Sequence, residues 1–145
     1  MEDIAKAIGE RFADKILKNE EKSLRRIYLD IDPGDVSVAA KFLFRDLRCR
    51  FVTATGIDTP SGIEILYHFS HDPTGKVISL RTLIADKKRP QIESIAAIIT
   101  GAEWIEREMW EMLGIKFKGH PNLKRLLLAD EWPEGKYPLR HEHES

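Results

Sequence analysis

Residues 51–84 read FVTATGIDTPSGIEILYHFSHDPTGKVISLRTLI, and this segment carries the clearest structural signal in the chain. Asp58–Gly62 and Asp72–Gly75 combine Asp, Pro and Gly, the residues that favour tight turns. Around these turns apolar and polar residues alternate, as they do in half-buried strands. The segment therefore predicts three strands that short turns join into an antiparallel meander. The three strands are expected at residues 51–57, 63–70 and 77–84.

The residues before the meander carry one strand pattern and two helix patterns. Apolar residues recur every four positions over residues 2–17, which predicts an amphipathic helix that ends at the charged stretch 18–22. Residues 24–31 alternate and predict a strand. A turn at 32–34 follows, and the apolar face of residues 35–48 predicts a second helix.

Beyond the meander the pattern becomes helical. Residues 86–90 form a polar loop with three consecutive basic residues. A short helix is expected at 92–100 and a longer one at 102–113, which Gly114 ends. Together the elements predict an α+β domain over residues 1–114. Its antiparallel or mixed sheet is expected to carry helices packed on one face.

Residues 115–145 have little regular pattern but many apolar side chains. Three prolines interrupt any helix or strand there, yet the apolar density is too high for a disordered tail. These side chains must be buried, either against the domain's own sheet or against another protein. We expect an extended docking tail that covers a partner, since ~3.3 Å per residue lets it cross a neighbouring subunit.

The composition limits what the chain can bind. It has 145 residues, 23 of them basic and 24 acidic, and a net charge of -1, so we expect no nucleic-acid partner. Cys49 is the single cysteine, which excludes an intramolecular disulfide and a four-cysteine iron–sulfur or zinc site. No apolar run reaches the ~18 residues of a membrane span. We also expect no cofactor, because no nucleotide-binding fingerprint is present.

Glu103, Glu106 and Glu108 precede His120, and such a set invites a metal or acid–base interpretation. The spacing matches no ligand motif such as HExxH, so a charged helix face is the preferred interpretation. We therefore expect no metal and no catalytic residue. Two alternatives stay open: a free-standing small-molecule enzyme that uses Glu106, Glu108 and His120, and a general protein-binding module.

The C-terminal third resembles a known family. Its ordered motifs are similar to the signature of the thirty-kilodalton subunit of respiratory complex I. Residues 109–113, MWEML, depart from the form common in complex I, and residues 132–140, WPEGKYPLR, look like the version in membrane-bound nickel–iron hydrogenases and related archaeal complexes. We therefore favour the hydrogenase-type branch over NADH:quinone oxidoreductase. The motifs are Glu106–Glu108, Leu113–Pro121, Leu123, Arg125–Leu127, Trp132 and Tyr137–Arg140.

The resemblance implies a role without chemistry of its own. Members of that family carry no cofactor and lay their C-terminal segment along a subunit similar to the nickel–iron hydrogenase large subunit. A neighbouring iron–sulfur subunit belongs to the same complex. The complex couples electron transport to ion translocation, and the family stands on its cytoplasmic side, peripheral to the inner face of the cell membrane. We expect this chain to brace the core of such an oxidoreductase.

The expected interface combines apolar and charged anchors. Aromatic and arginine residues often dominate interface energies, and the C-terminal segment is dense in both. Glu106 and Arg107 are expected to fix the exit of the tail from the last helix. The full set is Glu106, Arg107, Phe117, His120, Pro121, Arg125, Leu127, Trp132, Tyr137, Pro138 and Arg140.

Overall fold

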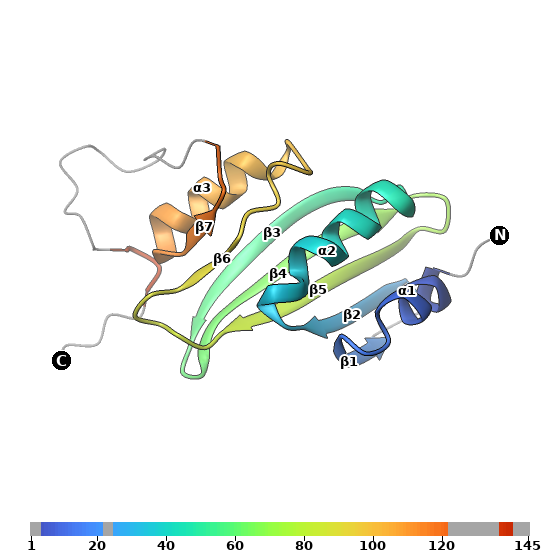
Figure 1. The fold of residues 1–145 in the computed structure, drawn as a ribbon, viewed down its shortest axis with the longest axis horizontal. Coiled ribbons are helices and arrows are strands. Elements are labelled where there is room, and N and C mark those ends of the chain that lie inside the picture. Colours follow the sequence, from blue (N-terminus) through green and yellow to red (C-terminus); the bar gives the residue numbers. More distant parts are fainter. Residues whose placement is uncertain (1–3, 22–24, 122–136, 141–145) are drawn as a thin grey trace.

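A computed structural model of the protein describes residues 4–21, 25–121 and 137–140. Its main feature is a mixed sheet in the order β1-β2-β5-β4-β3 (Figure 1). Neighbouring strands are antiparallel except β2 and β5, which are parallel. The expected antiparallel meander is confirmed as β3-β4-β5. The strands are β1 (Ile16–Glu21), β2 (Arg26–Ile31), β3 (Arg50–Thr59), β4 (Gly62–His71) and β5 (Lys76–Ile84).

One face of the sheet is apolar and carries the helices. The register places Tyr67 of β4 opposite Leu80 of β5, and Leu80 opposite Leu29 of β2, so these side chains share that face. Helices α1 (Ile4–Phe12) and α2 (Val36–Lys41) cover it, and α2 continues as a π-helical segment, Phe42–Asp46 (Figure 1). Burial of these apolar side chains supplies the main stabilisation of the domain.

The opposite face of the sheet is polar. Arg81 donates to Asp30 at 2.7 Å across the parallel pair, and the His68 ring lies 2.7 Å from the hydroxyl of Ser79. The alternation of apolar and polar residues thus separates a packed face from a solvent-facing one. The α+β class with helices on one face is confirmed.

A second unit lies beside β3. It consists of α3 (Ala102–Leu113) and a two-stranded parallel sheet of β6 (Gln91–Glu93) and β7 (Lys116–Lys118) (Figure 1). Helix α3 packs on the apolar face at Gly56, where an added Cβ would stand 2.5 Å from a methyl carbon of Leu113. This close approach requires glycine. The helix ends at Gly114, as expected, in the left-handed conformation with φ +79°.

Three expectations about local structure are wrong. The N-terminal helix stops at Phe12, and residues 16–21 instead form β1, because pairing with β2 satisfies their backbone. Residues 92–100 are not a helix: β6 pairs with β7, and turns follow. Regular structure also continues past residue 114, since β7 lies there.

The second helix has a different form from the one expected over 35–48. Its last part winds as a π-helical segment, and Arg48 then adopts φ 56° before β3 begins. The proposed division of the chain at residue 114 stays a prediction, although Ile115 and Phe117 pack into the core of the preceding domain. Within the described residues, no helix is long and apolar enough to cross a membrane.

Candidate functional site

The candidate site is the set of contacts that hold the C-terminal segment on α3. Strand β7 leads the chain back from the end of α3 towards its beginning, where His120 lies against Glu103. The segment then returns to the other end of α3 at Tyr137–Arg140. We call Ser94, Glu106 and His120 the first anchor, and Asp58, Lys87 and Arg140 the second anchor.

The first anchor is centred on the carboxylate of Glu106, which has 0% exposed surface. Its oxygens accept hydrogen bonds from the Ser94 hydroxyl and from the backbone N–H of Ile95, the latter at 2.9 Å. Burial raises the pKa of Glu106, while the hydrogen bonds from Ser94 and Ile95 and the charge of His120 act to lower it. Glu106 therefore organises the loop after β6.

His120 joins the C-terminal segment to this centre. Its Nε2 lies 2.9 Å from the backbone oxygen of Glu103 and 3.9 Å from a carboxylate oxygen of Glu106. A carbonyl oxygen only accepts, so Nε2 carries the hydrogen and donates it. Because the His120 side chain is fully buried, this contact fixes the chain just before Pro121.

The second anchor is centred on the carboxylate of Asp58, whose side chain is 0% exposed. The Nζ of Lys87 lies 2.6 Å from one oxygen, and Nε of Arg140 lies 3.6 Å from the other. Two cations thus neutralise one buried anion, which offsets much of its desolvation cost.

Arg140 also satisfies backbone carbonyls. Its guanidinium donates to the oxygen of Leu113 at 3.1 Å and to that of Lys87 at 2.7 Å. The N–H of Leu139 donates to the oxygen of Met112 at 2.8 Å. The last carbonyls of a helix lack intrahelical partners and carry the negative end of its dipole, so a cation is favourable there.

Tyr137 lies beside the second anchor, at the end of α3. A Cβ built on Gly114 would stand 2.6 Å from a ring carbon of Tyr137, so the ring lies directly against the helix end. Glycine therefore serves twice at this position, because it adopts a positive φ and leaves room for the ring.

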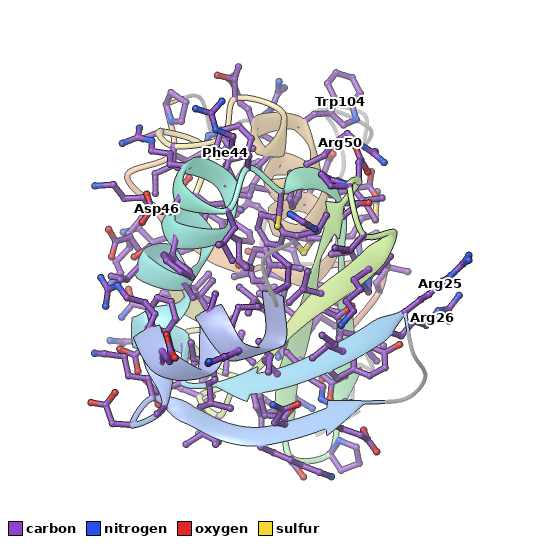
Figure 2. The ribbon with its side chains drawn as sticks, turned by 90° about the vertical axis from the view of Figure 1, so that its right-hand side faces the viewer. Arg25, Arg26, Phe44, Asp46, Arg50 and Trp104 are labelled. Carbon is purple, nitrogen blue, oxygen red and sulfur yellow. The ribbon has the colours of Figure 1, made fainter. Side chains whose placement is uncertain are left out.

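The other expected interface residues lie in different environments, some buried and some exposed. Phe117 is 2% exposed and belongs to the chain's own core, which leaves no free surface for a partner in this conformation. Arg107 is 9% exposed, and its guanidinium lies 6.0 Å from the ring centre of Trp104. Trp104 itself is 58% exposed and points outward (Figure 2). Pro121 and Pro138 are exposed. Arg125, Leu127 and Trp132 lie outside the described residues.

The structure brings together only two of the three residues considered for a small-molecule enzyme. Glu106 and His120 meet, but they bind a hydroxyl and backbone groups of their own chain. Glu108 instead lines a groove between α3 and β3. Burial raises the pKa of the Cys49 thiol to about 11, which leaves the thiol protonated near neutral pH.

Three residues of the anchors were not predicted from the sequence. Asp58 was assigned to a turn, although it continues the inward spacing of Ala54 and Gly56 along β3. That alternation is the signal that could have found it. Ser94 and Lys87 carry no comparable signal, because their partners come from distant positions.

The fold and anchors define a class of protein: a small α+β domain whose C-terminal segment is held at both ends of its last helix. Residues 29–145 match the family described as respiratory-chain NADH dehydrogenase, 30 Kd subunit. The match extends over both anchors and most of the chain. The chain belongs to this family, whose members are subunits of complexes of the respiratory complex I type.

Relatives with named functions come from several organisms. The chain is 32% identical over 142 residues to an NADH-quinone oxidoreductase subunit of Chloroherpeton thalassium, a match that covers 95% of this chain and 58% of that one. It is 30% identical over 144 residues to an F(420)H(2) dehydrogenase subunit of Methanosarcina mazei, with 97% and 90% coverage. The chain spans only 15% of a longer NADH-quinone oxidoreductase subunit of Bacteroides thetaiotaomicron. Several relatives are therefore much longer than the region they share with this chain.

A solved structure supports the fold. A chain of the membrane-bound sulfane sulfur reductase, an archaeal respiratory membrane complex, superposes with a TM-score of 0.81 at 23% identity. The match covers 94% of this chain and 81% of that chain. The fold is therefore shared with a chain of that complex.

Proposed function

We propose that the chain is a non-catalytic peripheral subunit of a membrane-bound, ion-translocating redox complex. In this role it braces a core similar to the hydrogenase large subunit, beside an iron–sulfur subunit, on the cytoplasmic side. The observation that carries the proposal is the double anchoring of the C-terminal segment on α3. Family membership supports it, because the matched region includes both anchors.

The anchors leave a long connection between two fixed points. Helix α3 has 12 residues and is therefore about 18 Å long. The chain between residues 121 and 137 can reach roughly 50 Å when extended, at ~3.3 Å per residue. We propose that a partner binds along this excess length. Fixing both ends lowers the entropy that the segment loses on binding, which favours affinity.

The branch of the family is part of the proposal. We keep the hydrogenase-type branch as the proposed one, on the motif at residues 132–140. The similarity to the F(420)H(2) dehydrogenase subunit of Methanosarcina mazei, over 97% of this chain, supports a place outside the NADH-quinone oxidoreductases. The similarity to the Chloroherpeton thalassium subunit, at 32% identity, keeps the quinone-reducing branch as the alternative.

The test replaces residues 122–136 by a Gly/Ser linker of the same length and leaves both anchors in place. The variant is expected to keep its thermal unfolding midpoint within a few degrees. It should fail to co-purify with the redox subunits from membranes. A matched control replaces the exposed turn at residues 60–61 with Gly/Ser and should co-purify normally. Co-purification of the linker variant at the wild-type yield would overturn the docking role of the segment.

A further inference from the structure

The second anchor borders a cavity of about 420 Å³ with a strongly basic lining. It lies between the loop before β6 and the end of α3. Among the described residues, its lining contains cations and no acidic side chain. In a chain with a net charge of -1, this is a local concentration of positive charge. The cations are Lys88, Arg89, Lys116 and Arg140.

The walls of the cavity are held in place by the protein's own contacts. The carboxylate of Asp86 accepts hydrogen bonds from the backbone N–H groups of Lys88 and Arg89, at 3.0 and 3.1 Å. The N–H of Lys116 donates to the oxygen of Pro90 at 2.9 Å. These contacts hold Lys88, Arg89 and Lys116 through their backbone N–H groups or their neighbours' backbone and do not use their side-chain cations.

The cations differ in how far other groups of the chain balance their charge. Arg140 is paired with Asp58 and with two carbonyls, so its charge is largely balanced. Lys88, Arg89 and Lys116 are exposed. Like charges placed close together repel one another, and an anionic ligand removes that repulsion. A carboxylate suits this lining because arginine binds it in a bidentate fashion.

We propose that this cavity receives an acidic segment of a neighbouring subunit in the complex. The positive charge of the lining indicates an acidic ligand. The position of the cavity indicates that a neighbouring subunit supplies this ligand. Tyr137 and Arg140 line the cavity and also lie at the end of the segment that we propose to dock. The cavity and the docking segment therefore face the same partner. The inference rests on the proposed function and adds to it a second, electrostatic contact, which guides association and fixes register.

The first test reverses charge in the full chain within its complex. The variant Lys88→Glu/Arg89→Glu is expected to reduce the amount of chain retained with the redox subunits at least tenfold at physiological salt. The control Lys41→Glu/Arg45→Glu makes the same charge change at exposed residues of α2 and the π-helical segment, and it should be retained normally. Both variants should match the wild type in thermal unfolding.

A second measurement identifies the occupant. Arg89 is replaced by a photo-reactive benzoylphenylalanine, and the cross-linked peptide is identified by mass spectrometry. A peptide of another subunit that carries several Asp or Glu residues is expected. Cross-linking to a peptide without acidic residues would overturn the proposal.

The outcomes separate this inference from the proposed function. If the wild-type chain fails to co-purify with any redox subunit, the proposed function is wrong, and this inference with it. If the wild type co-purifies and the Lys88→Glu/Arg89→Glu variant equals its control, only the cavity inference is wrong. Binding of the wild-type chain to phosphatidylglycerol vesicles, lost in that variant while assembly stays normal, would assign the cavity to membrane lipid and also overturn it.

Discussion

The two anchors hold the same segment by different physical means. At the first anchor Glu106 is buried among hydrogen-bond donors, and its charge is costly there, so its pKa is raised. At the second anchor Asp58 is equally buried but stands between two cations. One anchor therefore depends on hydrogen bonds in a dry environment, and the other on compensated charge near the surface.

This difference predicts unequal sensitivity to mutation. The partners of Glu106 are buried, so removing the carboxylate leaves them with little access to water. Lys87 and Arg140 keep 23% and 17% of their side chains exposed, so water can replace part of what Asp58 supplies. The first anchor should thus contribute more to the stability of the domain.

Glu106→Ala is expected to have the largest effect. It leaves the Ser94 hydroxyl and the Ile95 N–H without their acceptor and removes the carboxylate beside the His120 ring. The expected cost is about 4 kcal/mol in free energy of unfolding. Urea denaturation followed by circular dichroism measures this. Glu103→Ala, on the same helix, keeps the carbonyl that His120 uses and serves as the control. A loss below about 1 kcal/mol for Glu106→Ala would show that the first anchor is not structural.

Asp58→Ala should cost less, about 3 kcal/mol, because Lys87 and Arg140 lose their carboxylate but stay partly solvated and keep their backbone acceptors. The same urea titration measures the loss, and Arg50→Ala provides the comparison. Arg50 and Asp72 form an ion pair whose side chains are both 61% exposed, a type that contributes about 0–1 kcal/mol. Equal losses for the two variants would contradict the assignment of Asp58 as a buried anchor.

Gly114→Ala tests the junction between α3 and Tyr137. The positive φ alone costs about 1 kcal/mol in alanine, and the clash with the ring adds about another 1 kcal/mol. In a Tyr137→Ala background only the cost of the positive φ should remain. A double-mutant cycle on unfolding free energies measures the difference. Full additivity of the two substitutions would mean that the ring does not contact residue 114 in solution.

The smallest expected effect is on the pH dependence of stability at the first anchor. A carboxyl group whose pKa is raised on folding binds more protons in the folded state, so stability falls as pH rises above its ordinary value near 4.5. Glu106→Gln removes this titration. Above pH 4.5 and towards neutrality, the variant should therefore show a flatter decline in unfolding free energy than the wild type. A steeper decline in the variant would mean that folding lowers the pKa of Glu106 instead of raising it.

Much of the fold followed from local pattern. The strands of the meander alternate in polarity and are separated by Pro- and Gly-containing turns, so each strand's inward face can be identified without knowing its neighbours. Helix α3 and its end at Gly114 are likewise local, since they depend on apolar spacing and on one residue with a positive φ. The family motifs lie in the same region and are linear in sequence.

Other features depended on contacts between distant residues. The residues of β1 and β6 have weak patterns, and they became strands because β2 and β7 supply hydrogen-bond partners. The anchors show this most clearly. Asp58 and Arg140 are far apart in sequence, and no local rule pairs them. Arg125, Leu127 and Trp132 stay predicted interface residues, since they lie outside the described residues.

The amino-acid sequence by itself determined the α+β class, the meander, the last helix and the family, because these depend on periodicity, turn residues and linear motifs. Only the tertiary structure decided that the C-terminal segment is fixed at both ends of α3, that Phe117 belongs to the core, and that Lys88, Arg89 and Lys116 border one cavity. The physical reason is that buried charges and cavities arise where elements meet, and the choice among many possible partners is made by packing.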